Sequence, residues 1–138
     1  MTLDEIGRNL PALFGALFVA ILFIQSGLDK VLDWKGNLEW LTGHFSKTFL
    51  NGTVPPMLAT ITFMELATGI LSLVGIFYFL FANSTILIFY ASIIGAASIA
   101  ALFFGQRVAK DYAGAAVLVP YFILTIILMY LTNPYSRV

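Results

Sequence analysis

Four long stretches of the chain are almost wholly apolar, and short polar segments separate them. Each stretch can form a transmembrane helix, which needs about 20 apolar residues to cross roughly 30 Å of hydrocarbon. The apolar runs are continuous rather than alternating, which favours helices over the strands of a barrel. The pattern predicts an all-α integral membrane four-helix bundle, a single transmembrane domain over residues 1–138, with spans at about residues 9–32, 56–81, 84–104 and 111–131.

Turn-forming residues mark the ends of these predicted spans. Asn83 and Ser84 predict a very tight turn between the second and third spans, since either residue can cap the next helix. Gly105 is typical of the residue that follows the end of a helix, here the third span. Asn133 and the proline after it end the fourth span.

A shorter amphipathic segment lies between the first two spans, at about residues 37–50. Asn37 suits its N-cap position, and the segment is too short to cross a bilayer. Trp34 and Trp40 stand where aromatic residues gather at a membrane interface. The pattern predicts a short helix that lies on the membrane surface, because apolar residues recur there at helical spacing: Leu38, Leu41, Phe45 and Phe49.

Composition supports the membrane assignment and excludes several classes of function. The chain is 60% hydrophobic and 10% charged, with a formal net charge of zero. A globular domain is typically about 25% charged, and a neutral chain has no electrostatic footprint for nucleic acid. The chain contains no cysteine, which removes disulfides, thiol relays and thiolate metal sites. We therefore expect no intrinsic cofactor and no metal site.

Glu65 is the most unusual polar residue, because it lies within the second apolar span. At 1.5 Å per residue it is about 13 Å from the start of that helix. A charged side chain at the centre of a transmembrane helix costs about 2.5–3.5 kcal/mol, and such residues normally face the bundle interior and have a partner. Four other small or polar residues fall on the same stripe of the helical wheel, namely Thr62, Thr68, Gly69 and Ser72.

Lys30 is the predicted partner of Glu65, because it ends the first span on the same side and its long side chain can reach into the bundle. We expect the polar residues at this end to form one vestibule, composed of Gln25, Ser26, Asp29, Lys30, Glu65, Thr68, Arg107, Lys110 and Asp111. Two interpretations stay open. The Lys30–Glu65 pair is either a structural pair that fixes helix register, or part of a pocket for a polar headgroup, a quinone or a small metabolite.

His44 is the only histidine of the chain. On a surface helix, a lone histidine is typical of a solvated side chain. The alternative is a proton-accepting or ligand-binding role beside the vestibule. A bis-histidine haem within this chain alone is excluded.

The distribution of basic residues predicts the orientation in the membrane. Four spans place both termini on one side, where Arg8 and Arg137 lie. The loops on the other side carry the remaining basic residues, and loops rich in Lys and Arg stay in the cytoplasm. The N-terminal segment does not have the pattern of a cleaved signal peptide. We expect the surface helix in the cytoplasm and both termini in the periplasm, since the opposite side holds Lys30, Lys35, Lys47, Arg107 and Lys110.

Three segments resemble the DoxX-like family of small four-span bacterial membrane proteins, particularly its members from flavobacteria among the Bacteroidetes. They are "FIQSGLDKVLDWKGNLEWLTGHFSK", "TFMELATGILSLVGI" and "GQRVAKDYAGAAVL". The likeness covers most of the chain and lies in three short motifs. These are S-G-x-x-K at the end of the first span, E-x-x-x-G in the second, and a K-D pair that opens the fourth.

The resemblance implies a four-helix bundle in the bacterial inner membrane. The family is named for a subunit of thiosulfate:quinone oxidoreductase, and several relatives are associated with redox complexes. Relatives of the methylamine-utilisation type carry cysteines near the third loop, where this chain has "FFGQRVAKDY", so a thiol–disulfide role is not expected. The candidate positions that the resemblance implies are Ser26, Gly27, Lys30, Glu65, Gly69, Lys110 and Asp111.

Two functions follow as hypotheses. The first is an accessory subunit of a respiratory or other redox membrane complex, with a polar pocket for a quinone or a lipid headgroup. The alternative is a small-molecule transporter or binding protein that uses the vestibule of Lys30 and Glu65. Whether the chain is an enzyme stays open, although no residue here carries electrons, which favours a role that is not catalytic on its own. Expected partners are the lipid bilayer and other membrane subunits or further copies of the chain, with no nucleic acid.

Overall fold

The computed structural model describes residues 1–135, and all of its regular secondary structure there is helical. Four of the helices are long and apolar enough to cross a membrane, which confirms the predicted four-helix bundle. Two shorter helices accompany them. The six elements are α1 (Leu3–Arg8), α2 (Leu10–Leu32), α3 (Trp34–His44), α4 (Val54–Ala82), α5 (Ile86–Val108) and α6 (Tyr112–Thr132).

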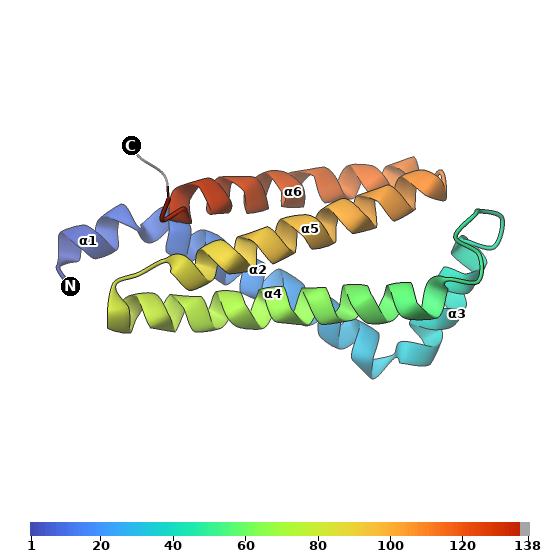
Figure 1. Ribbon diagram of the computed structural model, residues 1–138, viewed down its shortest axis with the longest axis horizontal. Coiled ribbons are helices and arrows are strands. Elements are labelled where there is room, and N and C mark those ends of the chain that lie inside the picture. Colours follow the sequence, from blue (N-terminus) through green and yellow to red (C-terminus); the bar gives the residue numbers. More distant parts are fainter. Residues whose placement is uncertain (136–138) are drawn as a thin grey trace.

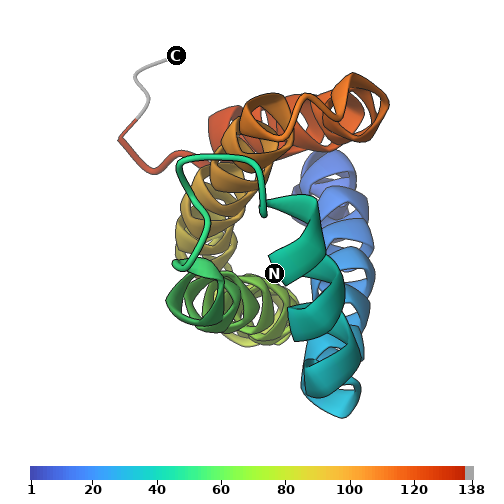
Figure 2. The same ribbon diagram turned by 90° about the vertical axis from the view of Figure 1, so that its right-hand side faces the viewer.

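The four long helices run up and down in chain order (Figure 1). Among the long helices, α2 packs on α4, α4 on α5 and α5 on α6. The contact between α6 and α2, which closes the ring, is less extensive than these three. The short helix α1 and the end of α6 lie at one end of the bundle. At the other end, α3 lies across the mouth of the bundle (Figure 2). Helix α3 therefore covers one end of the bundle.

Close packing between α2 and α4 depends on two glycines. A Cβ atom on Gly69 would lie 2.7 Å from the backbone nitrogen of Ile24, and one on Gly27 would lie 2.6 Å from the side chain of Leu66. Ser72 also donates a hydrogen bond of 2.7 Å to the carbonyl of Ala16. Small residues allow this approach in membrane bundles, where lipid tails are as apolar as leucine and packing drives association.

The predicted boundary of the third span at Gly105 is wrong, because α5 continues to Val108. Gly105 instead lies inside the helix, where a Cβ atom would meet the ring of Phe45 at 3.3 Å. The chain reverses at Lys110, which has a positive φ of 60°. Asp111 then caps α6, accepting a hydrogen bond of 2.9 Å from the backbone of Gly114.

The short helix between the first two spans also differs from the prediction at both ends. It begins at Trp34 and ends at His44, rather than covering residues 37–50. Asp33 is its cap, since its carboxylate accepts from the backbone N–H of Gly36. Asn37 does not cap the helix; its amide donates to the carbonyl of Asp33 at 2.8 Å. The sequence prediction missed that α3 follows α2 almost without interruption.

Helix α1 was not predicted. Thr2 and Glu5 form a capping box, in which each side chain bonds the backbone of the other. This local pattern is a recognised signal for a helix start, but the six-residue helix is too short to show an apolar face of its own.

Candidate functional site

The candidate site is centred on an ion pair between α2 and α4. Lys30 Nζ lies 3.0 Å from Glu65 Oε2, and the Glu65 side chain is 1% exposed. Lys30 Nζ also donates to the hydroxyl of Ser26 at 3.0 Å. The carboxylate therefore faces the bundle interior and meets the predicted cation. Charge pairing and hydrogen bonding together reduce the cost of holding these groups away from water.

The two threonines of the α4 seam are buried but satisfied locally. Thr62 donates to the carbonyl of Leu58 and Thr68 to that of Met64, each at 2.7 Å. Such bonds to the preceding turn of the same helix are how threonine satisfies its hydroxyl within a span. Thr68 is therefore a packing residue beside Glu65, and its hydroxyl does not line the pocket described next.

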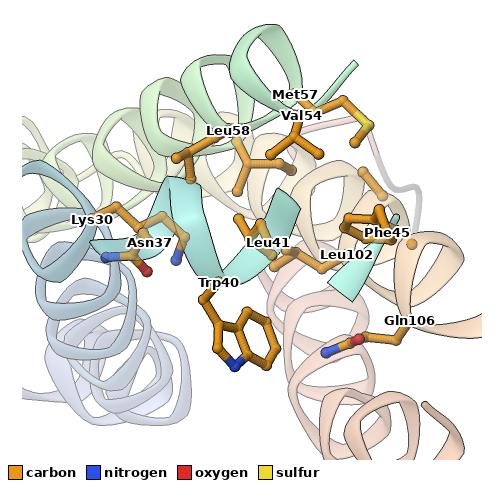
Figure 3. Close-up of a pocket in the computed structure, with 13 residues that line it drawn as sticks. Lys30, Asn37, Trp40, Leu41, Phe45, Val54, Met57, Leu58, Leu102 and Gln106 are labelled. Carbon is orange, nitrogen blue, oxygen red and sulfur yellow. The ribbon is translucent and has the colours of Figure 1, made fainter. Parts of the chain in front are cut away.

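A cavity of about 240 Å³ lies beside the ion pair, under α3. Lys30 enters it from α2, and α3 covers it with Trp40 and Leu41 (Figure 3). Its wall is mostly apolar, and its polar side-chain groups belong to Lys30, Asn37 and Gln106, together with the indole N–H of Trp40. The residues that line it are Lys30, Asn37, Trp40, Leu41, Phe45, Val54, Met57, Leu58, Ile61, Ala101, Leu102, Gly105 and Gln106.

Gln25 and Asp29 do not belong to this pocket, so the vestibule predicted from the sequence is too wide. Both side chains are exposed on the outer face of α2, beside a shallow apolar hollow that includes Leu28. Successive residues turn by about 100° around a helix, and Ser26 and Lys30 lie on the adjoining, inward face. Gln25 and Asp29 lie at the same end of the bundle as Lys30, but on a different face of α2.

The three charged residues predicted near the start of α6 also lie outside the pocket. Arg107 is exposed and lies over the ring of Tyr112, 4.5 Å from its centroid. Lys110 is exposed at the turn, and Asp111 caps α6. The pocket residue at this corner is Gln106, which sequence reasoning missed because an uncharged glutamine at the end of a span gives no distinctive signal.

His44 lies beside the pocket and connects α3 to the end of α5 and the start of α6. Its Nε2 is 2.8 Å from Gln106 Oε1 and 3.9 Å from Asp111 Oδ2. Its ring stacks on Trp40, with centroids 4.6 Å apart, and 15% of its side chain is exposed. The interpretation of His44 as simply solvated is therefore wrong. This histidine holds the covering helix in place and fixes Gln106 at the pocket wall.

The fold and the buried pair define a multi-pass membrane protein with a small interfacial pocket. Comparisons of the chain with protein-family models, curated proteins and solved structures found no match. The likeness to the DoxX-like family thus stays a prediction. Its motif residues on α2 and α4 gather at one contact, where Gly27 and Gly69 bring the helices together around Lys30 and Glu65.

Metal ligation has no support in the described part of the chain. Among residues 1–135, no group of three His, Asp or Glu side chains is placed to hold a metal ion. His44 and Asp111 form a pair without a third ligand, and Asp111 already caps α6. The chemistry available at the site is hydrogen bonding and charge within an apolar enclosure.

Proposed function

We propose that this protein binds the polar end of a lipid-soluble molecule, a quinone or a lipid headgroup, in the pocket under α3. It does so as an accessory subunit of a respiratory or other redox complex in the bacterial inner membrane. One observation carries the proposal. An apolar cavity at the end of a membrane bundle is lined by a lysine whose ammonium Glu65 and Ser26 hold in a fixed position.

The dimensions and lining of the pocket fit the head of such a molecule. Pockets that enclose a drug-sized ligand have volumes of about 300–1,000 Å³, and this cavity has about 240 Å³. It therefore suits a single ring or headgroup, with any tail remaining outside. Aromatic and aliphatic side chains would pack on the ring, while the amide of Gln106 can donate a hydrogen bond to its oxygens. Lys30 can do the same in exchange for its long bond of 3.4 Å to the carbonyl of Ser26.

A bound quinone would supply the electron-carrying chemistry that the side chains of this chain lack. The residues of the chain bind the head, orient it through Lys30 and Gln106, and exclude water through the covering helix α3. A partner subunit with a redox group is then needed for electron transfer. The resemblance to a family associated with redox complexes supports the same role.

The pocket proposal can be tested through the intrinsic fluorescence of Trp40, because a quinone quenches a tryptophan that it touches. The chain has two tryptophans, so Trp34→Phe leaves Trp40 as the only fluorophore. In lipid nanodiscs, a benzoquinone with a decyl tail is expected to quench Trp40 with a saturable dependence on quinone concentration. The matched control is Trp40→Phe, in which Trp34 lies outside the pocket wall and should show only unsaturable quenching by quinone dissolved in the lipid.

Equal, unsaturable quenching in the two single-tryptophan variants would contradict a quinone site. A lipid headgroup site would instead appear as a shift of Trp40 emission when the lipid of the nanodisc is changed from phosphatidylcholine to phosphatidylglycerol, again absent for Trp34. Failure of both responses would remove the proposed function.

We also propose that α3 faces the cytoplasm and that the N-terminus faces the periplasm. Lys30, Lys35 and Lys47 lie on or next to the α3 side, as do the two basic residues of the α5–α6 corner. Arg8 lies at the other end, and Arg137, which the sequence assigned to the same side, falls outside the described residues. The positive-inside rule supports this orientation.

Single cysteines can test the orientation cleanly, because the chain has none. Gly7→Cys and Gly43→Cys are a matched pair, since a Cβ atom at either site meets nothing within 4 Å. A membrane-impermeant maleimide is expected to label Gly7→Cys in intact spheroplasts, and Gly43→Cys only after lysis. The reverse labelling pattern would overturn the orientation.

A further inference from the structure

A second apolar hollow, of about 350 Å³, adjoins the pocket on the outer side of α4 and α5. The two hollows share wall residues, namely Met57, Ile61, Ala101 and Gly105. We infer that the outer hollow is a groove for the hydrocarbon tail of the bound molecule, and that the molecule enters sideways from the bilayer between these helices. This inference rests on the proposed function, because it assigns the tail of the same ligand.

The position of the groove along α4 matches the hydrocarbon layer. Pro56, Thr60 and Met64 line it at successive turns of the helix. Since α4 begins at Val54, Met64 lies about 15 Å along the helix at 1.5 Å per residue. That distance is about half of a hydrocarbon core of roughly 30 Å. The groove therefore follows α4 from its first turn, at the end that α3 covers, towards the middle of the helix.

The outer wall of the groove is open to lipid. Thr60 is exposed, and Phe104 is 56% exposed on the α5 side. The inner wall leads to the pocket, where Lys30 holds the polar end of the ligand. Two adjoining hollows, with Lys30 in the wall of the inner one and exposed residues in the wall of the outer one, fit one kind of occupant: a molecule with a polar head and a single apolar tail.

The alternative entrance, from water past α3, is blocked by several contacts. His44 bonds Gln106, and Phe45 is buried against Gly105. A tailed molecule that entered by this route would also have to leave the hydrocarbon. Each methylene that leaves the hydrocarbon layer for water weakens the binding of the molecule to the membrane about fourfold. The groove avoids this loss, because the tail passes from lipid to an equally apolar wall.

The substitution Thr60→Phe tests the groove, because Thr60 lines the outer hollow and does not line the pocket. The probes are a benzoquinone with a decyl tail and the same ring without the tail, titrated against Trp40 fluorescence in Trp34→Phe. We expect Thr60→Phe to weaken the tailed quinone about tenfold, because the phenyl ring would overpack the space that the tail occupies while the head is bound. The tailless ring should bind with unchanged affinity.

The matched control is Ala59→Phe. Ala59 is the preceding exposed residue of α4 and lines neither hollow, so its substitution should change the binding of neither probe. Equal binding of the tailed quinone to Thr60→Phe and to the control would overturn the groove while leaving the pocket intact. Equal weakening of both probes by Thr60→Phe would also overturn it, by showing damage to the pocket. Loss of both probes in the unsubstituted background would instead refute the proposed function.

Discussion

Replacing Lys30 with methionine is expected to lower the free energy of unfolding by about 3–5 kcal/mol, because Glu65 is left buried without its cation. The carboxylate is 1% exposed and its Oε2 lies 3.0 Å from the Lys30 ammonium. Replacing both partners, with Lys30→Met and Glu65→Leu together, should recover most of this loss, since a buried ion pair exchanged for apolar residues is often near neutral. Denaturant titration in detergent micelles measures Lys30→Met, Glu65→Leu and the double variant.

Lys35→Met is the control for this comparison. Lys35 is an exposed lysine on the neighbouring helix α3 and forms no ion pair among residues 1–135, so its loss should change stability by less than about 0.5 kcal/mol. Additive losses in the double variant, with no recovery, would mean that the two side chains do not depend on each other.

Gly69→Ala is expected to destabilise the protein by about 1–3 kcal/mol, the usual cost of overpacking a well-filled contact. The added methyl group would lie 2.7 Å from the backbone nitrogen of Ile24. This backbone atom can move away only if the whole of α2 shifts. The same displacement would disturb Lys30, which α2 also carries. Thermal unfolding of the purified variant measures the effect.

Gly43→Ala serves as the matched control for Gly69→Ala, because a Cβ atom there meets nothing within 4 Å. An alanine in an open helical position is neutral or stabilising by up to about 1 kcal/mol. If both substitutions behaved alike, the close approach of α2 and α4 would not be a determinant of stability.

The sequence predicted the spans and the ion pair because both follow from strong physical constraints. A bilayer admits only helices and closed barrels, and continuous apolar runs of about 20 residues favour helices. The bilayer also makes an unpaired carboxylate costly. Glu65 therefore had to face inward, and Lys30 was the cation at the same end that could reach it. These constraints act on single residues and on helix length, so they can be read without knowledge of packing.

The face of each helix and the exact pocket wall could not be predicted in the same way. Gln25 and Asp29 were grouped with Lys30 because they share an end of the bundle, yet they lie on the outer face of α2. Gln106 and His44 gain their roles only from a contact between residues far apart in the chain. No local pattern marks such a contact, and the uncharged Gln106 does not stand out by charge.

Helix ends were misplaced where tertiary contacts outweigh local preference. Gly105 is a typical residue to follow a helix, but α5 continues past it because its missing side chain leaves room for the ring of Phe45. The reversal occurs instead at Lys110, in an unusual left-handed conformation. Asp33, rather than Asn37, caps α3 because α3 follows α2 directly.

A binding role for the Lys30–Glu65 site and a purely structural one differ in a single measurable outcome. The double variant with Lys30→Met and Glu65→Leu is expected to fold, so its affinity for the decyl-tailed benzoquinone can be measured through Trp40. The proposed function predicts about tenfold weaker binding or more, as expected for the loss of a hydrogen bond from a charged donor. Unchanged affinity in a folded double variant would contradict it, and would leave the pair as a structural contact between α2 and α4.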